Sequence, residues 1–303
     1  MKPAILSSLG NLFGERLQEN IPLAPYTSAR IGGPADALLT VRSADELAEA
    51  VTRLWEMDVP YVILGGGSNV LVSDKGVRGV AVLNRAKAVR FNLGDQPTVW
   101  AESGAVFSSL AHRAAAKGLA GLEWAATVPG TVGGAVYGNA GAFGDDVAGS
   151  LIHAEILTAK GGERWPVEKM GYGYRASALK QQAIRAVVLS AEMRLENSTP
   201  EAVAEKIGAF TRRRKSTQPP GASMGSMFKN PQGDHAGRLI EAAGLKGKRS
   251  GNAEISPLHA NFFINHGQTR AEDVEALIEL TQKEVAEKFG VKLELEIELI
   301  GEW

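Results

Sequence analysis

Residues 61–69 read Tyr-Val-Ile-Leu-Gly-Gly-Gly-Ser-Asn, a short apolar run that ends in three consecutive glycines. The apolar run predicts a buried strand, and Val70–Val72 predicts another strand directly after the loop. Because glycine has no Cβ, consecutive backbone N–H groups of this loop can converge on one anion, with Ser68 and Asn69 as further donors. The loop is typical of a phosphate or pyrophosphate site. The alternative is a tight turn between two strands, and the sequence of this loop alone favours neither interpretation.

The surroundings of this loop exclude a dinucleotide-binding fingerprint of the G-x-G-x-x-G kind, because that spacing is absent and no helix follows. Upstream, Ser43 and Glu46 form a capping box ahead of a helix whose apolar positions recur at helical spacing. Downstream, strands are predicted at 80–83 and 99–102, and a helix at 107–117 that stops at Gly118. This order of elements favours an α+β fold.

A second glycine-rich segment covers residues 129–144 and reads Pro-Gly-Thr-Val-Gly-Gly-Ala-Val-Tyr-Gly-Asn-Ala-Gly-Ala-Phe-Gly. Its composition predicts irregular backbone. Glycine clusters raise the entropy cost of folding, which a fold tolerates most readily where backbone must lie close to a ligand. A pair of surface turns is the alternative. The apolar positions Val132 and Val136 between the glycines favour the binding interpretation.

The rest of the chain continues the α+β pattern, with a composition shift after Pro219-Pro220. A helix is expected to start at Thr199-Pro200, with proline at its first position, and to run to about Lys215. Thr269 with Glu272 is expected to cap a long helix that ends near Gly290. The other predicted elements are strands at 152–158, 186–195 and 261–264, a loop at 221–231, a helix at 235–243, and a strictly alternating strand at 293–300.

Composition narrows the function classes. The chain has 303 residues, 33 basic and 34 acidic, so its net charge of −1 argues against a dedicated nucleic-acid or membrane-surface binder. It has no cysteine, which excludes disulfides, thiolate nucleophiles and cysteine metal sites. The first ten residues lack a signal-peptide pattern, and no run of 18 apolar residues occurs. We therefore expect a cytoplasmic protein that does not insert into membranes. The histidines show no metal spacing, so no metal site is predicted.

Seven motifs in one order resemble a known family. Four are rich in glycine or small residues: Arg30-Ile-Gly-Gly33, residues 64–69, residues 129–134 and Asn139-Ala-Gly-Ala142. The other three are Tyr174-Arg-Ala-Ser177, Gly225-Ser-Met-Phe-Lys-Asn-Pro231 and Leu293-Glu-Leu-Glu296. Together they resemble the flavin-dependent UDP-N-acetylenolpyruvoylglucosamine reductases, which share the vanillyl-alcohol-oxidase type of FAD-binding domain. The resemblance covers nearly the whole chain.

The resemblance implies a two-subdomain FAD-binding domain and a C-terminal α+β substrate-binding domain. The expected boundaries are 1–84 and 85–200 for the two flavin subdomains and 201–303 for the substrate domain. FAD would lie between the two subdomains, with its pyrophosphate on the first glycine loop and the second loop lining the pyrophosphate and the isoalloxazine. The implied cofactor-binding residues are Arg30, Gly65, Gly66, Gly67, Ser68, Asn69, Pro129, Gly130, Thr131, Gly133, Gly134, Asn139, Ala140 and Gly141.

The implied reaction makes UDP-N-acetylmuramate for the bacterial cell wall. NADPH would reduce FAD, and the reduced flavin would pass a hydride to C3 of the enolpyruvyl group of UDP-N-acetylglucosamine enolpyruvate. Carried over position by position, Arg175 would stabilise the substrate carboxylate as charge builds on it. Ser226 would give a proton to C2, because a positioned hydroxyl is acidic enough for a carbanion-like carbon. Glu296 would contribute while it carries or shares a proton.

Each of these residues also has an ordinary interpretation. Arg175 alone would be a solvated surface arginine, and Ser226 a loop residue with a local turn hydrogen bond. Glu294, Glu296 and Glu298 alternate with apolar residues, so a solvated strand face is the default for the row. Only the motif selects Glu296 from the three.

The implied substrate-binding residues are Tyr174, Lys215, Lys229, Asn230 and His259. The basic run at 212–215 is interpreted either as a clamp on the substrate pyrophosphate, with Lys215 in it, or as charge at a helix C-terminus. Arg238 and Glu241 could pair with each other. His259 could equally be a core or surface histidine.

The chain resembles the shorter kind of family member. The spacing from Arg175 to Ser226 leaves no room for the extra loop whose tyrosine covers the substrate in longer relatives. Leu295, Gly138 and Phe143 stand where the family commonly has proline, methionine and tyrosine, which leaves the detailed shape around the flavin open. The sequence does not fix the oligomeric state, and a monomer is compatible with it. Two rivals remain: a flavin oxidase or dehydrogenase acting on an alcohol or sugar, and a non-catalytic flavin or UDP-sugar binder.

Overall fold

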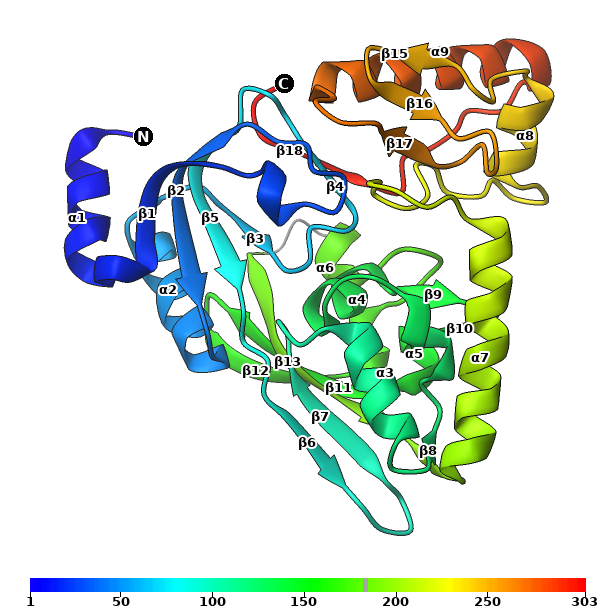
Figure 1. Cartoon of the computed structure of the whole chain (residues 1–303). Helices are drawn as coiled ribbons and strands as arrows, with labels where there is room; N and C mark the ends of the chain where they lie inside the picture. The colour runs from blue at the N-terminus through cyan, green and yellow to red at the C-terminus, as the bar shows by residue number, and fades with distance from the viewer. Residues whose placement is uncertain (182–184) are drawn as a thin grey trace. The chain divides into compact units, whose positions relative to one another are not determined.

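The computed structural model describes residues 1–181 and 185–303 and divides into two compact units. Unit 1 comprises Met1–Leu39, Pro60–Val82 and Lys215–Trp303, and unit 2 comprises Thr40–Val59 and Leu83–Arg214. Both units contain helices and strands (Figure 1), and the expected α+β class is confirmed. The division of the flavin-binding region near residues 84 and 200 stays a prediction.

The N-terminal part of unit 1 is a four-stranded sheet with the order β1-β2-β5-β3. Its bounds are Leu17–Pro22 for β1, Pro34–Val41 for β2, Tyr61–Leu64 for β3 and Val77–Asn84 for β5. Helix α1 (Pro3–Phe13) precedes β1. Beyond the first glycine loop, β4 (Val70–Val72) pairs in parallel with the last strand, β18 (Glu298–Ile300). The final strand therefore joins this part of the fold.

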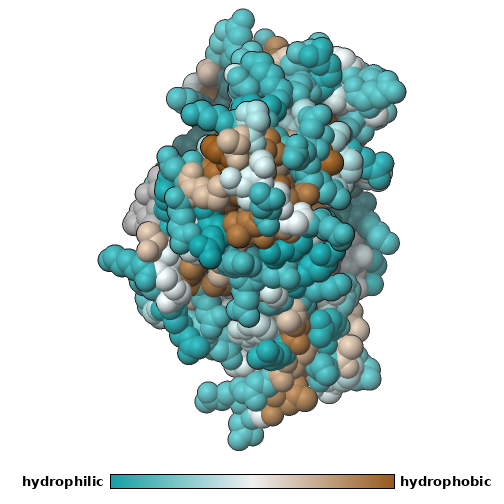
Figure 2. Space-filling view, turned by 90° about the vertical axis from the view of Figure 1, so that its left-hand side faces the viewer, coloured by the Kyte–Doolittle hydropathy of each residue, from teal (hydrophilic) through white to brown (hydrophobic). Residues whose placement is uncertain are grey.

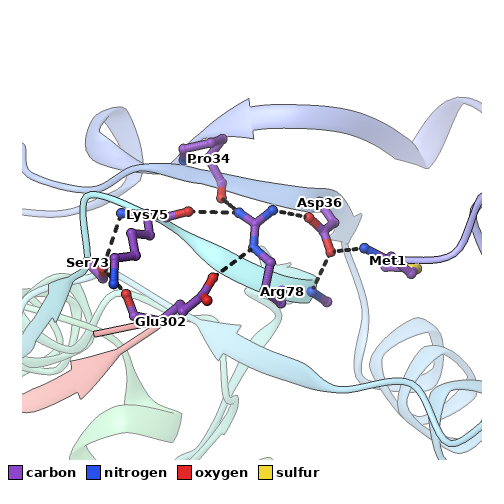
Figure 3. Close-up of polar contacts among 8 residues, drawn as sticks. Met1, Pro34, Asp36, Ser73, Lys75, Arg78 and Glu302 are labelled. Carbon is purple, nitrogen blue, oxygen red and sulfur yellow. Dashed lines mark hydrogen bonds and ion pairs between the residues drawn. The ribbon is translucent and has the colours of Figure 1, made fainter.

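Polar contacts link the two middle strands of this sheet, β2 and β5 (Figure 3). The carboxylate of Asp36, whose side chain is 8% exposed, accepts bonds from the amino group of Met1 and from Arg78, both at 2.6 Å. The Arg78 guanidinium also donates to the carbonyl oxygens of Pro34 and Lys75. Because Asp36 is buried and fully paired, removing its charge would leave the buried amino group without its partner.

The C-terminal part of unit 1 packs helices α8 (Ala236–Ala242) and α9 (Ala271–Phe289) with a three-stranded sheet. Its strands are β15 (Arg249–Ser250), β16 (Ala253–Ile255) and β17 (Phe263–Asn265). The buried rings of Phe228 and Phe263 meet edge to face at its centre.

The start of α9 differs from the prediction that Thr269 and Glu272 cap it. Arg270 is the N-cap, and its amide donates to the carboxylate of Asp273 at 2.9 Å. The carboxylate of Asp74 accepts the amides of Ala271 (2.9 Å) and Glu272 (3.1 Å). An acidic residue from the turn after β4 thus satisfies the first N–H groups of the helix and complements its dipole. Because Asp74 is 197 residues from the start of α9 in the sequence, no local pattern predicts this cap.

Unit 2 is built on an antiparallel five-stranded sheet with the order β12-β11-β13-β7-β6. The strands are β6 (Val89–Asn92), β7 (Thr98–Glu102), β11 (Leu151–Thr158), β12 (Gly161–Pro166) and β13 (Ala186–Arg194). Its longer helices are α2 (Ala44–Glu56), α3 (Phe107–Ala115) and α7 (Pro200–Thr217). Its short elements are β8 (Leu119–Ala120), α4 (Val132–Gly138), β9 (Gly141–Ala142), β10 (Asp145–Asp146), α5 (Val147–Ser150), α6 (Ala178–Gln181) and β14 (Glu196–Asn197).

The helix starts of unit 2 follow local sequence signals. Ser43 caps α2, since its Oγ accepts the Glu46 amide at 3.1 Å while the Glu46 carboxylate accepts the Arg42 amide at 2.7 Å. Thr199 caps α7 through the Ala202 amide. The capping predictions for these helices are confirmed.

Two expectations about irregular and regular backbone were wrong. Residues 129–144 contain the helix α4, because the amides of Val132 and Gly133 are already anchored to Ala105 and Ser103 and the chain turns over them. The segment 293–300 is a strand only at Glu298–Ile300. Its earlier half pairs with the loop at 227–229 and its later half with β4, so it changes partner near Glu296.

The surface carries few large apolar side chains. Figure 2 shows one face, where hydrophobic residues gather in separate groups among hydrophilic ones. Exposed examples lie on different elements, such as Leu12 on α1, Leu93 after β6 and Leu299 on β18. In the part of the chain that the structure describes, no helix has both the length and the apolar character needed to cross a membrane.

Candidate active site

The first glycine loop packs against the turn at residues 26–28. Gly67 has φ +57°, and a Cβ there would lie 2.2 Å from the Tyr26 carbonyl oxygen and 2.7 Å from the Thr27 Cα. The amide of Ser28 donates to the Gly67 carbonyl oxygen at 2.9 Å. Because both the backbone conformation and the close contact exclude a side chain, glycine is required here by the protein's own packing.

The amides of this loop remain open for a ligand. Within residues 1–181 and 185–303, the N–H groups of Gly66, Gly67 and Ser68 donate to no acceptor. Consecutive free N–H groups next to a left-handed glycine are a donor set that suits a pyrophosphate. The loop therefore fits the FAD pyrophosphate that the sequence assigns to it. Arg30, exposed and with φ +57°, ends the supporting turn through a bond from its amide to Thr27.

The far end of the loop is bonded to the segment that carries Glu296. The Asn69 side chain donates to the Glu296 carbonyl oxygen at 3.1 Å, and the Glu298 amide donates to the Asn69 carbonyl oxygen at 2.9 Å. Glu296 itself is half-buried. The structure thus brings Glu296 beside the first glycine loop. The Asn69 side chain holds the two segments together through its bond to the Glu296 carbonyl oxygen.

Ser226 lies on the extended segment next to that of Glu296. The amide of Glu296 donates to the Met227 carbonyl oxygen at 2.8 Å, and the amide of Lys229 donates to the Glu294 carbonyl oxygen at 2.9 Å. On its other side Ser226 forms an isolated bridge with Phe262. Two of the three predicted catalytic residues are therefore neighbours in unit 1, on segments 70 residues apart in sequence (296 − 226).

Buried groups hold the Ser226 segment in place. The side chain of Asn261, 3% exposed, accepts the Phe228 amide and donates to the Phe228 carbonyl oxygen. The Lys229 ammonium lies 3.2 Å from the Glu294 carboxylate, and the Asn230 side chain accepts the Ala236 amide at the start of α8. The segment is thus anchored at Phe228, Lys229 and Asn230, which restricts the backbone that carries Ser226.

Arg175 lies in unit 2, at the corner of a tight turn. Gly173 and Ala176 exchange backbone hydrogen bonds across the turn, and Arg175 has φ +54°. Its guanidinium donates to the Gly141 carbonyl oxygen at 2.9 Å and lies 5.3 Å from the ring centre of Tyr174. Such a conformation favours glycine or asparagine, so an arginine here stores strain. The third predicted catalytic residue therefore accompanies the second glycine segment.

The arginine turn is tied to the end of helix α4. The Tyr172 hydroxyl donates to the Val136 carbonyl oxygen at 2.8 Å, and the Ser177 hydroxyl donates to the Tyr137 carbonyl oxygen at 2.6 Å. These carbonyls belong to the last turn of the helix, where no intrahelical donor is left for them. Burial, aided by the nearby Asp146 carboxylate, raises the pKa of Tyr172 well above its usual range.

The other predicted residues are spread over both units. Lys215 and Tyr174 are exposed. His259 is half-buried against Phe262, at 4.9 Å between ring centres, and burial lowers its pKa. The prediction that Arg238 pairs with Glu241 was wrong, because Arg238 bonds Asp234 while Glu241 lies 2.7 Å from Lys246.

The basic run at 212–215 lies inside the last turns of α7, which continues to Thr217. Burial lowers the pKa of Arg214, and its guanidinium donates to Thr127 at 3.4 Å. Arg213 lies over the ring of Phe143, which stacks on Phe210 at 4.3 Å. Phe143, which stands where the family commonly has tyrosine, therefore has an apolar partner of its own. The role of Lys215 as a pyrophosphate clamp stays a prediction.

The sequence did not single out two residues that organise the second segment, Asp146 and Tyr172. Asp146 caps α5 by accepting the Gly149 amide, and it also accepts a bond from Asn139. Asp before a short small-residue run is an N-cap signal that could have identified the first role. No local sequence pattern indicates the bond between Asp146 and Asn139 or that between Tyr172 and the Val136 carbonyl oxygen.

Comparisons with known proteins agree along the whole chain. A family model described as the UDP-N-acetylenolpyruvoylglucosamine reductase C-terminal domain matches residues 216–300, and an FAD-binding domain model matches 35–165. The reductase of Chloroflexus aggregans is 46% identical over 94% of this chain and 97% of its own length. That of Bacillus subtilis is 41% identical over 93% of each.

A solved structure has the same fold. The crystal structure of UDP-N-acetylenolpyruvylglucosamine reductase from Thermus caldophilus superposes with a TM-score of 0.80 at 36% identity, covering 94% of this chain and 99% of that one. The chain thus has an FAD-binding domain followed by the C-terminal domain characteristic of these reductases. By sequence, fold and motif order, it belongs to the UDP-N-acetylenolpyruvoylglucosamine reductase family.

Proposed function

We propose that this chain is an FAD-dependent, NADPH-using reductase that converts UDP-N-acetylglucosamine enolpyruvate to UDP-N-acetylmuramate, a precursor of peptidoglycan. The observation that carries the proposal is the pairing of the Ser226 and Glu296 segments beside the free amides of the first glycine loop. The names of the relatives support the same reaction. A cytoplasmic location and a monomeric state belong to the same proposal.

The first glycine loop would hold the pyrophosphate of FAD through the amides of Gly66, Gly67 and Ser68. Bound FAD would supply the hydride chemistry that links NADPH to C3 of the enolpyruvyl group. In the second segment, the assignment of Pro129, Gly130, Thr131, Gly133, Gly134, Ala140 and Gly141 to the cofactor also belongs to this proposal, as does that of Arg30.

Arg175 binds the substrate carboxylate through paired charge-assisted hydrogen bonds. As hydride reaches C3, negative charge spreads from C2 onto this carboxylate, and the fixed guanidinium stabilises it more than it stabilises the ground state. The strained turn keeps the arginine from relaxing into solvent. Tyr174, Lys215, Lys229, Asn230 and His259 are proposed to contact the rest of the substrate.

Ser226 donates its hydroxyl proton to C2, which completes the addition of two hydrogens across the double bond. Glu296, on the neighbouring segment, stabilises the charge at C2 while it carries or shares a proton. The Ser226 alkoxide then regains a proton from solvent or from Glu296. General acid catalysis of this kind contributes about 100- to 10,000-fold to a rate.

The experiment follows the flavin absorbance of the purified, FAD-loaded protein without oxygen. NADPH should bleach the flavin band, and UDP-N-acetylglucosamine enolpyruvate should restore it with formation of UDP-N-acetylmuramate. Bleaching without recovery would overturn the substrate assignment. Rapid recovery in air alone would favour a flavin oxidase acting on an alcohol or sugar.

The Ser226→Ala variant separates an enzyme from a binder. In the reductase, bleaching by NADPH should persist while recovery with the enolpyruvyl substrate slows by about 1,000-fold. A non-catalytic flavin or UDP-sugar binder would show no turnover in either form.

A further inference from the structure

Asn139 occupies a special position at the end of helix α4. It is the C-cap of the helix, with φ 46° and ψ 58°, in the left-handed region that asparagine tolerates better than most residues. Its side chain is buried, at 3% exposure. The resemblance assigns this residue to the flavin, yet the conformation and burial show a side chain directed into unit 2.

The carboxamide of Asn139 is fully used by the protein. Its Nδ2 donates to the Asp146 carboxylate at 3.1 Å and to the Gly173 carbonyl oxygen at 3.0 Å. Its Oδ1 accepts the Ala148 amide at 3.0 Å. A carboxamide has two N–H donors, so neither is left for a cofactor or substrate.

The bonds of Asn139 connect to Arg175 through Gly173 on one side and through Asp146 and Gly141 on the other. Gly173 is the base of the turn whose corner is Arg175. Asp146 is the base of the β9–β10 hairpin, where it pairs with Gly141. The Gly141 carbonyl oxygen accepts the bond from the Arg175 guanidinium at 2.9 Å. Asn139 therefore holds both the backbone that carries the guanidinium and the hairpin that receives it.

Space around Gly141 shows how closely the hairpin and the guanidinium fit. A Cβ on Gly141 would lie 2.8 Å from the Asp145 carbonyl oxygen and 3.3 Å from an Arg175 guanidinium nitrogen. The hairpin and the guanidinium thus pack with no room to shift towards each other. The left-handed conformation of Arg175 costs about 1–3 kcal/mol and persists only when the surroundings over-determine it.

We propose that Asn139 is a positioning residue for the reaction, acting through Arg175 and not through contact with FAD. The inference rests on the proposed function, because the guanidinium matters only if it stabilises the enolpyruvyl carboxylate. With the carboxamide removed, Gly173 and Asp146 lose their common donor and the arginine turn relaxes. A shift of about 1 Å in a catalytic group can slow the chemical step by about 100-fold.

The test compares Asn139→Gly with the parent protein. Glycine removes the carboxamide without straining the left-handed backbone, whereas alanine would strain it. We expect FAD affinity and flavin reduction by NADPH to change less than about 3-fold, and flavin recovery with the enolpyruvyl substrate to slow by about 30- to 100-fold. Asn139→Ser removes the carboxamide without adding a charge beside Asp146, and its hydroxyl is too short to replace the bonds to Asp146 and Gly173 together, so it should show the same split if the glycine variant folds poorly.

A double-mutant cycle distinguishes positioning from general damage. In an Arg175→Met background, Asn139→Gly should slow flavin recovery by less than about 2-fold more, because its effect passes through the arginine. The matched control is Thr158→Val at the β11–β12 turn, where a buried hydroxyl bonding Glu163 is lost. This control should lower the melting temperature and leave both half-reactions unchanged.

Three results would overturn the inference. Loss of FAD affinity or a shifted flavin spectrum in Asn139→Gly would make the residue a cofactor contact. Equal slowing of both half-reactions would make it a purely structural residue, and so would full additivity in the cycle. Failure of the parent protein to turn over the enolpyruvyl substrate would instead overturn the proposed function, so the two failures are distinguishable.

Discussion

The two glycine-rich segments have similar compositions and opposite uses of their backbone. In the first, at 64–69, the amides of Gly66, Gly67 and Ser68 donate to no acceptor in the described parts of the chain. In the second, at 129–144, the amides of Val132 and Gly133 are bonded to Ala105 and Ser103, and the chain forms a short helix. The first segment therefore leaves three consecutive amides for a ligand, whereas the second has at least two of its amides bonded to its own framework.

The difference shows that glycine content alone does not identify a binding backbone. At Gly67 the missing Cβ makes room for the neighbouring turn, and the ligand donors are a consequence of that packing. In the second segment the polar side chains of Asn139 and Asp146 do the organising, and the outcome is a positioned guanidinium. The first segment is therefore expected to control cofactor affinity, and the second the rate of substrate reduction.

The largest expected effect tests the second half of this comparison. Arg175→Met should slow flavin recovery with the enolpyruvyl substrate by about 1,000-fold, because a preorganised charge stabiliser is lost. Flavin reduction by NADPH should change little. Stopped-flow absorbance measures both steps. If the two steps slowed together, the division of labour between the segments would be wrong.

Gly67→Ala tests the first half. A Cβ at this position meets backbone at 2.2 Å in a left-handed conformation, so we expect a loss of about 2–4 kcal/mol in the free energy of unfolding. FAD affinity should fall by about 100-fold because the amides would move with the loop. Urea unfolding and flavin titration measure the two quantities. Unchanged flavin affinity in a folded variant would contradict the role of these amides.

Tyr172→Phe should weaken the tie between the arginine turn and α4 by about 1–2 kcal/mol, the cost of leaving the buried Val136 carbonyl without its donor. The parent protein should also show a pH dependence that the variant lacks. Because the pKa of Tyr172 is raised in the folded state, its contribution is complete below the unfolded pKa of about 10 and declines as the pH rises above it. Unfolding at pH 9 and 10.5 tests the sign. If the free energy of unfolding changed equally with pH in the parent protein and the variant, Tyr172 would not be the group responsible.

The smallest effect is expected at Gly138, in the second segment. A Cβ there meets nothing within 4 Å, and the residue lies in the last turn of α4. Gly138→Ala should stabilise the protein by about 0.5 kcal/mol, since alanine favours helix more than glycine does. Thermal unfolding of this variant is the matched control for Gly67→Ala. A loss as large as that of Gly67→Ala would mean that the two segments tolerate side chains alike.

Local signals in the sequence were sufficient for much of the fold. Ser43 and Thr199 each mark a helix start with a side chain that caps it, and Tyr61–Leu64 leads into the first loop as a strand. The motifs also selected Ser226 and Glu296, which the structure brings to neighbouring segments. For the two caps and the strand the information lies within a few residues of the feature, whereas the choice of Ser226 and Glu296 came from the family resemblance.

The failures come from contacts that join distant residues. The sequence predicted Thr269 as the cap of α9, but the carboxylate of Asp74 takes that position. The strand expected at 293–300 is divided because its halves bond to different partners, the loop at 227–229 and β4. The resemblance implies a contact between Asn139 and the cofactor, whereas its partners in the structure, Asp146 and Gly173, lie further along the chain.

The pairing of β18 with β4 has a consequence for biosynthesis. Unit 2 is complete once residue 214 has been made, whereas β18, which pairs with Val70–Val72, begins 84 residues further along the chain (298 − 214). The first glycine loop lacks its bond between the Glu298 amide and the Asn69 carbonyl oxygen until that strand has been made. We therefore expect this loop to reach its final conformation after unit 2 has folded.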